Sequence, residues 1–170
     1  MGSLEPGSRR SAFRLEAMGL EAWDTDEDGL AGWRDRATKA PVPDPYDWHD
    51  PVETAGMEYR VRRDRVEALH RRSRDRTVYL CGCAGGEDEF WDLLDLVICL
   101  AVDNDTLRHR LATRTTNDYG KAEHELTAIL AANATWAEDY RGYGAVVIDG
   151  TRPLDDVVSE IIRVADEHAR

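Results

Sequence analysis

The sequence predicts a single α/β domain with three layers, in which helices cover both faces of a mostly parallel β-sheet. Short apolar segments of strand length alternate with longer segments of helical periodicity. The apolar segments end in small or acidic residues, and ligands in such sheets bind beyond the carboxyl ends of the strands. The chain has 170 residues, enough for one core and too few for two. We therefore expect residues 1–170 to form one domain.

Four segments have the length and composition of buried strands. Each is rich in valine, isoleucine, leucine or aromatic residues and is bounded by turn residues. They are residues 20–24, 77–83, 93–103 and 144–150. Because strands that alternate with helices form parallel sheets covered on both faces, their polar carboxyl ends should meet at one edge.

The segments between the expected strands carry apolar residues at helical spacing. These helices are expected over residues 60–74, 106–113, 121–140 and 154–169. Pro153 stands where the last helix would begin, and the two aspartates that follow suit its positive end. Residues 38–57 include Pro41, Pro43 and Pro45 and break the periodicity, which indicates a long substrate-side loop or lid.

Composition argues against several classes of protein. The net charge of −12 makes general affinity for nucleic acid or for an anionic membrane improbable. No apolar run approaches the roughly 18 residues of a membrane span, and the sequence lacks the apolar segment of a signal peptide. Cys81, Cys83 and Cys99 are odd in number and lie in apolar segments, so free buried thiols are expected. A reducing, cytoplasmic location fits.

The run from Asp105 to Lys121 is the strongest functional signal. It places Arg108, Arg110 and Arg114 on a short helix that leads into a polar loop, and residues so spaced cannot all be core. Guanidinium groups suit bidentate contact with phosphate oxygens, and the loop resembles a hinged lid over residues 114–121. The alternative is a solvent-facing helix whose arginines pair with nearby acids, an interpretation that suits Arg108 best.

The acidic segment DTDEDGLAGWRD allows a second interpretation. Its residues Asp24, Asp26, Asp28, Gly29 and Asp35 fall at positions 1, 3, 5, 6 and 12 of a calcium-loop pattern. The entering segment is short and strand-like, position 12 is not glutamate, and no partner loop exists. A calcium-binding module and a merely solvated turn both stay open as alternatives.

Together these motifs resemble P-loop kinases of the shikimate-kinase or nucleoside-kinase type, and more closely a group of small ATP-binding proteins. The resemblance is carried by DTDEDG, by the lid LATRTTNDYGK and by DGTRPLDDVVSEI near the end, and it covers nearly the whole chain. It implies a P-loop NTPase fold, ATP and Mg²⁺ as cofactors, and a small hydroxylated molecule as phosphoryl acceptor.

The resemblance also implies roles for individual residues. Asp24 would orient or deprotonate the acceptor hydroxyl and Asp26 would help to hold Mg²⁺, because a hard cation and a proton both require carboxylate oxygens. Arg110 and Arg114 would neutralise the transferring phosphate. The loop over the adenine would contain Thr151, Arg152 and Pro153, and the glycine-rich turn beside the acceptor would contain Gly82, Gly85 and Gly86.

The N-terminus departs from the family pattern. A phosphate-binding loop reads GxxxxGK[ST], and here Gly2 and Gly7 keep the glycine spacing. Ser8 stands where the lysine belongs, and Arg9 where the magnesium-binding hydroxyl belongs. A register shifted to Arg10 and Ser11 restores a cation and a hydroxyl but loses both glycines.

The first strand of this fold, which lies in the middle of the sheet, also has no counterpart in the sequence. Three explanations are open: a truncated chain, a replaced N-terminus, or a true member that has lost catalysis. Loss of the lysine contact would cost about 2–4 kcal/mol of transition-state stabilisation, so we expect feeble kinase activity at best. A non-catalytic protein that binds nucleotide or a protein partner is the alternative. A homo-oligomer is also open, since another chain could supply the strand.

Overall fold

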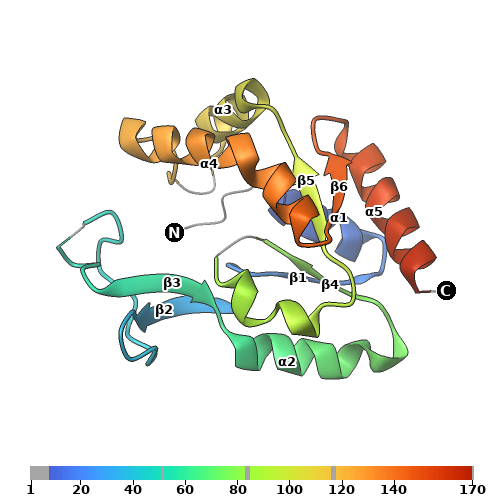
Figure 1. Cartoon of the computed structure of the whole chain (residues 1–170), viewed down its shortest axis with the longest axis horizontal. Coiled ribbons are helices and arrows are strands. Elements are labelled where there is room, and N and C mark those ends of the chain that lie inside the picture. Colours follow the sequence, from blue (N-terminus) through green and yellow to red (C-terminus); the bar gives the residue numbers. More distant parts are fainter. Residues whose placement is uncertain (1–7, 51, 83–84, 116–117, 170) are drawn as a thin grey trace.

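The computed structural model describes residues 8–50, 52–82, 85–115 and 118–169, and it shows a mixed α/β protein (Figure 1). The helices are α1 (Ser8–Ala17), α2 (Arg63–Arg72), α3 (Asn104–Thr113), α4 (Glu123–Gly142) and α5 (Leu154–His168). The strands are β1 (Glu21–Asp24), β2 (Ala31–Asp35), β3 (Met57–Val61), β4 (Val78–Cys81), β5 (Ile98–Ala101) and β6 (Val146–Asp149). Short 3₁₀ turns are η1 (Ser73–Asp75), η2 (Glu87–Glu89) and η3 (Trp91–Leu93).

The strands form three separate pairs. β1 pairs with β4 and β5 pairs with β6, both in parallel, whereas β2 and β3 form an antiparallel hairpin. In the parallel pairs Asp24 lies opposite Cys81, and Ala101 lies opposite Asp149. Within the described ranges, therefore, the expected continuous parallel sheet is present as two halves.

Helices pack against both faces of these strands. α1 and α5 share one face, where Leu15 and Val158 pack with Ala22 of β1 and with Tyr79 of β4. On the other face, Val66 of α2 packs with Leu80, the next residue along β4. Side chains alternate between faces along a strand, so β4 is apolar on both sides, as strands covered by two helical layers are.

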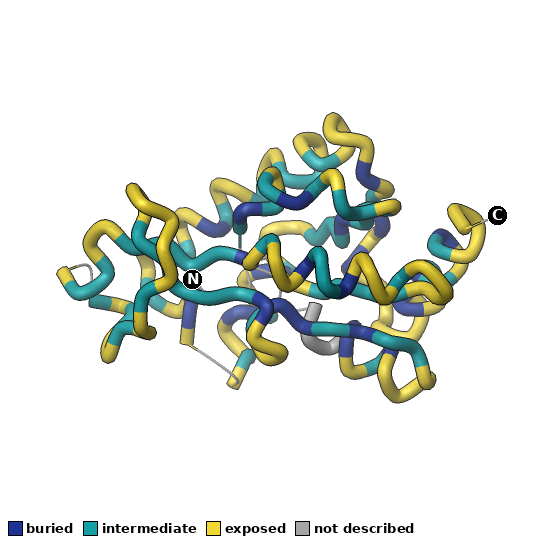
Figure 2. Tube along the Cα trace, turned by 90° about the horizontal axis from the view of Figure 1, so that it is seen from below, coloured by how far each residue is buried: buried dark blue, intermediate teal, exposed yellow. Residues whose placement is uncertain are grey.

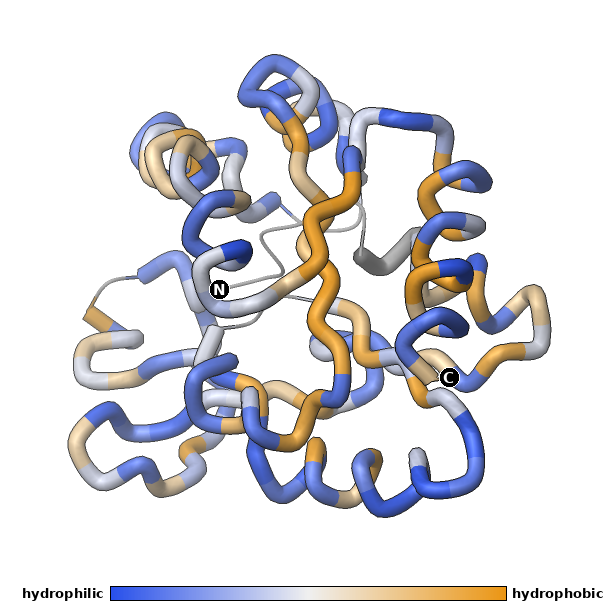
Figure 3. Tube along the Cα trace, turned by 45° about the vertical axis from the view of Figure 1, so that its right-hand side comes forward, coloured by the Kyte–Doolittle hydropathy of each residue, from blue (hydrophilic) through white to orange (hydrophobic). Residues whose placement is uncertain are grey.

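The interior of the molecule is apolar and its periphery is polar. The outer faces of the helices are exposed, whereas buried positions lie on their inner faces and along the strands (Figure 2). The hydropathy of the chain follows the same division, with the hydrophobic run around β5 at the centre (Figure 3). None of the described helices is both long and apolar enough to cross a bilayer.

Most elements expected from the sequence are confirmed, and the differences have local causes. The four expected strands form, but residues 93–97 precede β5 as a 3₁₀ turn and irregular chain. The expectation of one long irregular segment over residues 38–57 missed that β3 begins at Met57 and pairs with β2. The expected helix from residue 60 begins only at Arg63, because that hairpin takes the preceding residues.

Two of the three cysteines are confirmed as free thiols. Cys99 is buried, Cys81 is partly buried, and neither forms a disulfide. Burial raises the pKa of the Cys81 thiol to about 12, which makes it a packing residue rather than a nucleophile. Cys83 lies outside the described residues.

Candidate functional site

The segment Asp24–Thr25–Asp26 begins with the last residue of β1 and continues into a tight turn. Asp24 is 6% exposed, and its Oδ1 accepts hydrogen bonds from the backbone N–H groups of Asp26 (3.0 Å) and Glu27 (3.2 Å). The backbone N–H of Asp24 donates in turn to Oδ2 of Asp28 (2.7 Å). One oxygen of Asp24 is thus committed to holding the turn.

Two polar atoms in this turn are left over. Asp24 Oδ2 and Thr25 Oγ1 are buried, and among the described residues neither has a hydrogen-bond partner. An unsatisfied buried acceptor costs on the order of 1–3 kcal/mol, so such atoms mark a place where a ligand would be stabilising.

Gly82 closes this turn from β4. Its φ is +138°, and an added Cβ would lie 1.9 Å from Oγ1 of Thr25. The missing side chain therefore makes room for Thr25. Gly85 and Gly86, also at positive φ, approach the side chain of Arg60, and the carbonyl of Gly85 accepts from the backbone N–H of Val61 (3.2 Å). Whether the three glycines also face an acceptor stays a prediction.

Asp26 lies in the electrostatic field of Tyr59 on β3 and of Arg114 after α3. Burial raises the pKa of Tyr59, and the charges of Asp26, Asp44 and Asp24 add to that shift, as does the hydrogen bond from the phenol to Asp26. Burial lowers the pKa of Arg114, while Asp118, Asp26 and nearby groups act in the opposite direction. The fold therefore gathers a phenol, a carboxylate and a half-buried guanidinium from three segments.

The three arginines of the α3 region have different surroundings. Arg110 donates from Nη2 to the carbonyl of Gly150 (2.7 Å), which fixes α3 to the end of β6. Arg114 donates from Nη2 to the carbonyl of Tyr119, across the expected lid. Arg108 is exposed. Of the lid, Thr116 and Asn117 lie outside the described residues.

The loop after β6 is held by its own aspartate. Oδ1 of Asp149 accepts from the backbone N–H of Thr151 (2.9 Å) and from its hydroxyl (2.6 Å), which keeps the pKa of Asp149 below its usual value. Arg152 and Pro153 are exposed just ahead of α5. The adenine-side role predicted for these residues is compatible with their exposure and stays a prediction.

The loop of residues 38–56 is anchored against the lid region. Trp48 packs with Tyr119 at a ring distance of 5.8 Å, and Nδ1 of His49 lies 3.2 Å from a carboxylate oxygen of Glu125 on α4. Sequence reasoning missed Tyr59, because its strand was not foreseen. The contact of this loop with the lid region could have been predicted from Trp48, a large apolar residue in a proline-rich loop.

At the N-terminal end, the predicted nucleotide-binding glycines Gly2 and Gly7 lie outside the described residues. Ser8 and Arg9 begin α1. One turn further on, Ser11 is 3% exposed and lines the same cavity as Thr25 and Gly82. Whether either register of the phosphate-binding loop applies stays a prediction.

The calcium alternative receives no separate support from the geometry. Asp35 uses its Oδ1 to accept from the backbone N–H groups of Ala37 (3.0 Å) and Thr38 (2.7 Å), in a turn of its own after β2. Within the described part of the chain, no three acidic, histidine or cysteine side chains are grouped as metal ligands would be.

Comparison with protein-family models and with curated proteins gives no match for this chain. The functional argument therefore rests on the site itself.

Proposed function

We propose that this chain binds an ATP-like nucleotide and is of the small-molecule kinase type, transferring a phosphoryl group to a small hydroxylated acceptor. The observation that supports it most is the grouping of Asp24, Thr25, Asp26 and Arg114 beyond the carboxyl end of β1. Carboxylates beside a half-buried guanidinium suit phosphoryl transfer, where catalysis is mainly positioning and neutralisation of charge.

Each residue has a role that its surroundings permit. Oδ2 of Asp24 is the free acceptor atom for a substrate hydroxyl, while its Oδ1 keeps the carboxylate in place. Asp26 is the candidate Mg²⁺ ligand, and Arg114 is the candidate phosphate contact. Bound MgATP would supply the phosphoryl group, and its Mg²⁺ ion is a hard cation that would take a carboxylate oxygen of Asp26 as ligand.

A non-catalytic nucleotide-binding protein is the second candidate, and the lysines favour it. The ammonium group of Lys39 lies 2.8 Å from Glu58, and that of Lys121 lies 2.7 Å from Asp118. Both lysines of the chain are thus ion-paired, and Ser8 replaces the phosphate-binding lysine of the kinase pattern. Binding without turnover would follow.

Thermal unfolding with and without millimolar MgATP tests the proposal. A ligand that binds only the folded state stabilises it by about 2.7 kcal/mol at a hundredfold excess over its dissociation constant. We expect MgATP to raise the midpoint, and Arg114→Ala to abolish the rise. Arg108→Ala is the matched control, since Arg108 is an exposed arginine of the same region. No shift with wild-type protein would refute nucleotide binding.

Two further measurements separate the alternatives. If MgATP binds, ATP turnover that is lost in Asp24→Asn supports a kinase, whereas binding without turnover supports the non-catalytic candidate. A midpoint shift with calcium alone, lost in Asp28→Asn, would instead support the calcium-binding module.

A further inference from the structure

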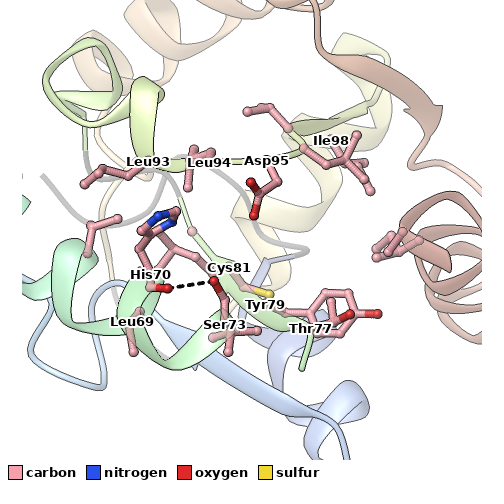
Figure 4. A pocket seen from close by; sticks show the side chains of 18 of the residues that line it. Leu69, His70, Ser73, Thr77, Tyr79, Cys81, Leu93, Leu94, Asp95 and Ile98 are labelled. Atoms are coloured by element: carbon pink, nitrogen blue, oxygen red, sulfur yellow. Dashed lines mark hydrogen bonds between the residues drawn. The ribbon is translucent and has the colours of Figure 1, made fainter. Parts of the chain in front are cut away.

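A cavity of about 690 Å³ lies between the two parallel strand pairs. One wall contains Thr77, Tyr79 and Cys81, and the opposite wall contains Leu94 and Ile98 (Figure 4). The cavity therefore separates β4 from β5.

The walls of this cavity are strand edges. Every residue from Thr77 to Gly82 and every residue from Leu93 to Leu100 lines it. Successive side chains of a strand point to opposite faces, so a cavity over one face would touch alternate residues only. Contact with consecutive residues of both segments means that the edges of β4 and β5 face each other across the cavity.

Backbone geometry shows that these edges are unpaired within the described structure. The carbonyl of Cys81 accepts from Thr25 (2.9 Å), so the peptide groups of Cys81 point towards β1. The carbonyl of Ala101 accepts from Gly150 (2.7 Å) and likewise points towards β6. Because peptide groups alternate in direction along a strand, those of Leu80 and Leu100 point into the cavity.

The hydrophobic core is also incomplete at this place. All four residues of β4 are only partly buried, as are Ile98 and Leu100 of β5. Helices line the cavity from both sides, with Leu15 of α1 on one and Val66 of α2 on the other. Protein interiors are normally packed as densely as organic crystals. A cavity with apolar walls and free peptide groups therefore has room for an occupant that is apolar and can form hydrogen bonds with the peptide groups.

Only an extended peptide satisfies both edges at once. β4 and β5 each have four residues, so an occupant of four to five residues, with a rise of about 3.3 Å per residue, would span them. Its side chains would meet helices on both faces, which requires an apolar sequence throughout.

We propose that this cavity is the position of a central β-strand that runs parallel to β4 and β5 and leads directly into α1. α1 is followed by β1, so its C-terminal end lies near the start of the strands and its N-terminal end near their carboxyl edge. Ser11 in the first turns of α1 confirms this direction, since it lines the cavity together with Thr25 and Gly82 beyond the strand ends. A parallel strand ending there joins α1 through a short turn.

This topology obeys the general rule for parallel strands. A strand, the helix α1 and then β1 form a crossover unit of the kind that connects parallel strands. The other apolar strand-like segments of the sequence already form β4, β5 and β6. Gly2 to Gly7 has the composition of a turn, which suits a short connection between such a strand and α1.

The test adds the missing strand. Three variants of the full chain are produced. The first carries Val-Ile-Val-Val-Val ahead of Gly2, and the second carries Ser-Gly-Ser-Gly-Ser at the same place. The third carries Val-Ile-Val-Val-Val after Arg170. Backbone amide exchange is measured in each. We expect the apolar N-terminal extension to slow exchange at Leu80 and Leu100 about tenfold or more. Tyr79 and Cys99, whose amides already pair within the existing ladders, are the internal references.

Each outcome decides the proposal. Selective protection by the apolar N-terminal extension alone supports it. Equal protection by the C-terminal extension would overturn it, because the cavity would then accept any apolar strand. Unchanged exchange at Leu80 and Leu100 in every variant would overturn it. The readout does not involve nucleotide, so failure here is distinguishable from failure of the kinase proposal.

Discussion

At the scale of single residues, Gly82 has the most demanding position in the site. Its φ of +138° disfavours any L-residue with a side chain, and a Cβ there would overlap Oγ1 of Thr25. We expect Gly82→Ala to lower the free energy of unfolding by about 1–3 kcal/mol, since strained backbone and steric overlap add. Urea denaturation measures the loss.

The control for this prediction is Gly32→Ala. Gly32 has no positive φ, and nothing lies within 4 Å of the position that a Cβ would take there, so its substitution should change stability by less than about 0.5 kcal/mol. Adding Thr25→Ala to Gly82→Ala should recover only part of the steric loss, because the Cβ of residue 25 would still lie 2.8 Å from the added Cβ. Equal stability of the two glycine variants would show that the close approach to Thr25 is unimportant.

At the scale of elements, the β2–β3 hairpin is held by charges around Glu58. Its Oε1 lies 2.8 Å from Lys39 and 2.8 Å from Arg34. The hydrogen bond from Lys39, followed by that from Arg34, lowers the pKa of Glu58 from 4.5 to about 2. Arg34 also pairs with Glu89, which ties the hairpin to η2.

This network predicts a pH dependence. Because the pKa of Glu58 is lower in the folded state, its stabilisation is complete above about pH 4.5 and is lost as the pH falls through about 2. We expect Glu58→Gln to reduce stability at pH 7 and to flatten its decline between about pH 4.5 and 2. Urea unfolding across this range measures both effects. Glu138→Gln, an exposed carboxylate on α4, should leave the wild-type curve unchanged.

The loop of residues 38–56 depends on its tryptophan. Trp48 packs with the apolar cluster of α3 and α4 that contains Tyr119. We expect Trp48→Ala to release the loop and to speed limited proteolysis within it, because loops with few buried contacts open at low cost. Tyr46→Ala is the control, since Tyr46 in the same loop is fully exposed. Identical cleavage rates would show that the loop is held by other contacts.

How far the elements were predictable depends on how local their signals are. α5 and β6 were predictable because valine and isoleucine recur there at regular spacing and Pro153 marks the boundary. The β2–β3 hairpin was not, because its two strands are joined by 21 residues, from Arg36 to Gly56, without a short turn signal. The acidic turn at Asp24 was found by its position, whereas Tyr59 enters the site only through that hairpin.

At the scale of the whole molecule, the two parallel strand pairs share few residues. Tyr79 is one of them: it packs against the α1–β1 cluster of Leu15 and Ala22, and also against the cluster of β6 and α5 that contains Ile148 and Ile161. Burial raises the pKa of its phenol. A single aromatic ring thus spans part of the space between the halves, on the face that α1 and α5 cover.

Tyr79 therefore sets how cooperatively the halves unfold. We expect Tyr79→Ala to cost about 2–3 kcal/mol, less than for a fully buried aromatic residue because Tyr79 is partly exposed. Amide exchange should then separate into a β1–β4 group and a β5–β6 group, because the halves lose a shared contact. Tyr79→Phe, which keeps the ring, should retain one cooperative transition. If the two ladders of Tyr79→Ala still exchange together, other contacts couple the halves, and the strand that completes the sheet would add stability without being needed for cooperativity.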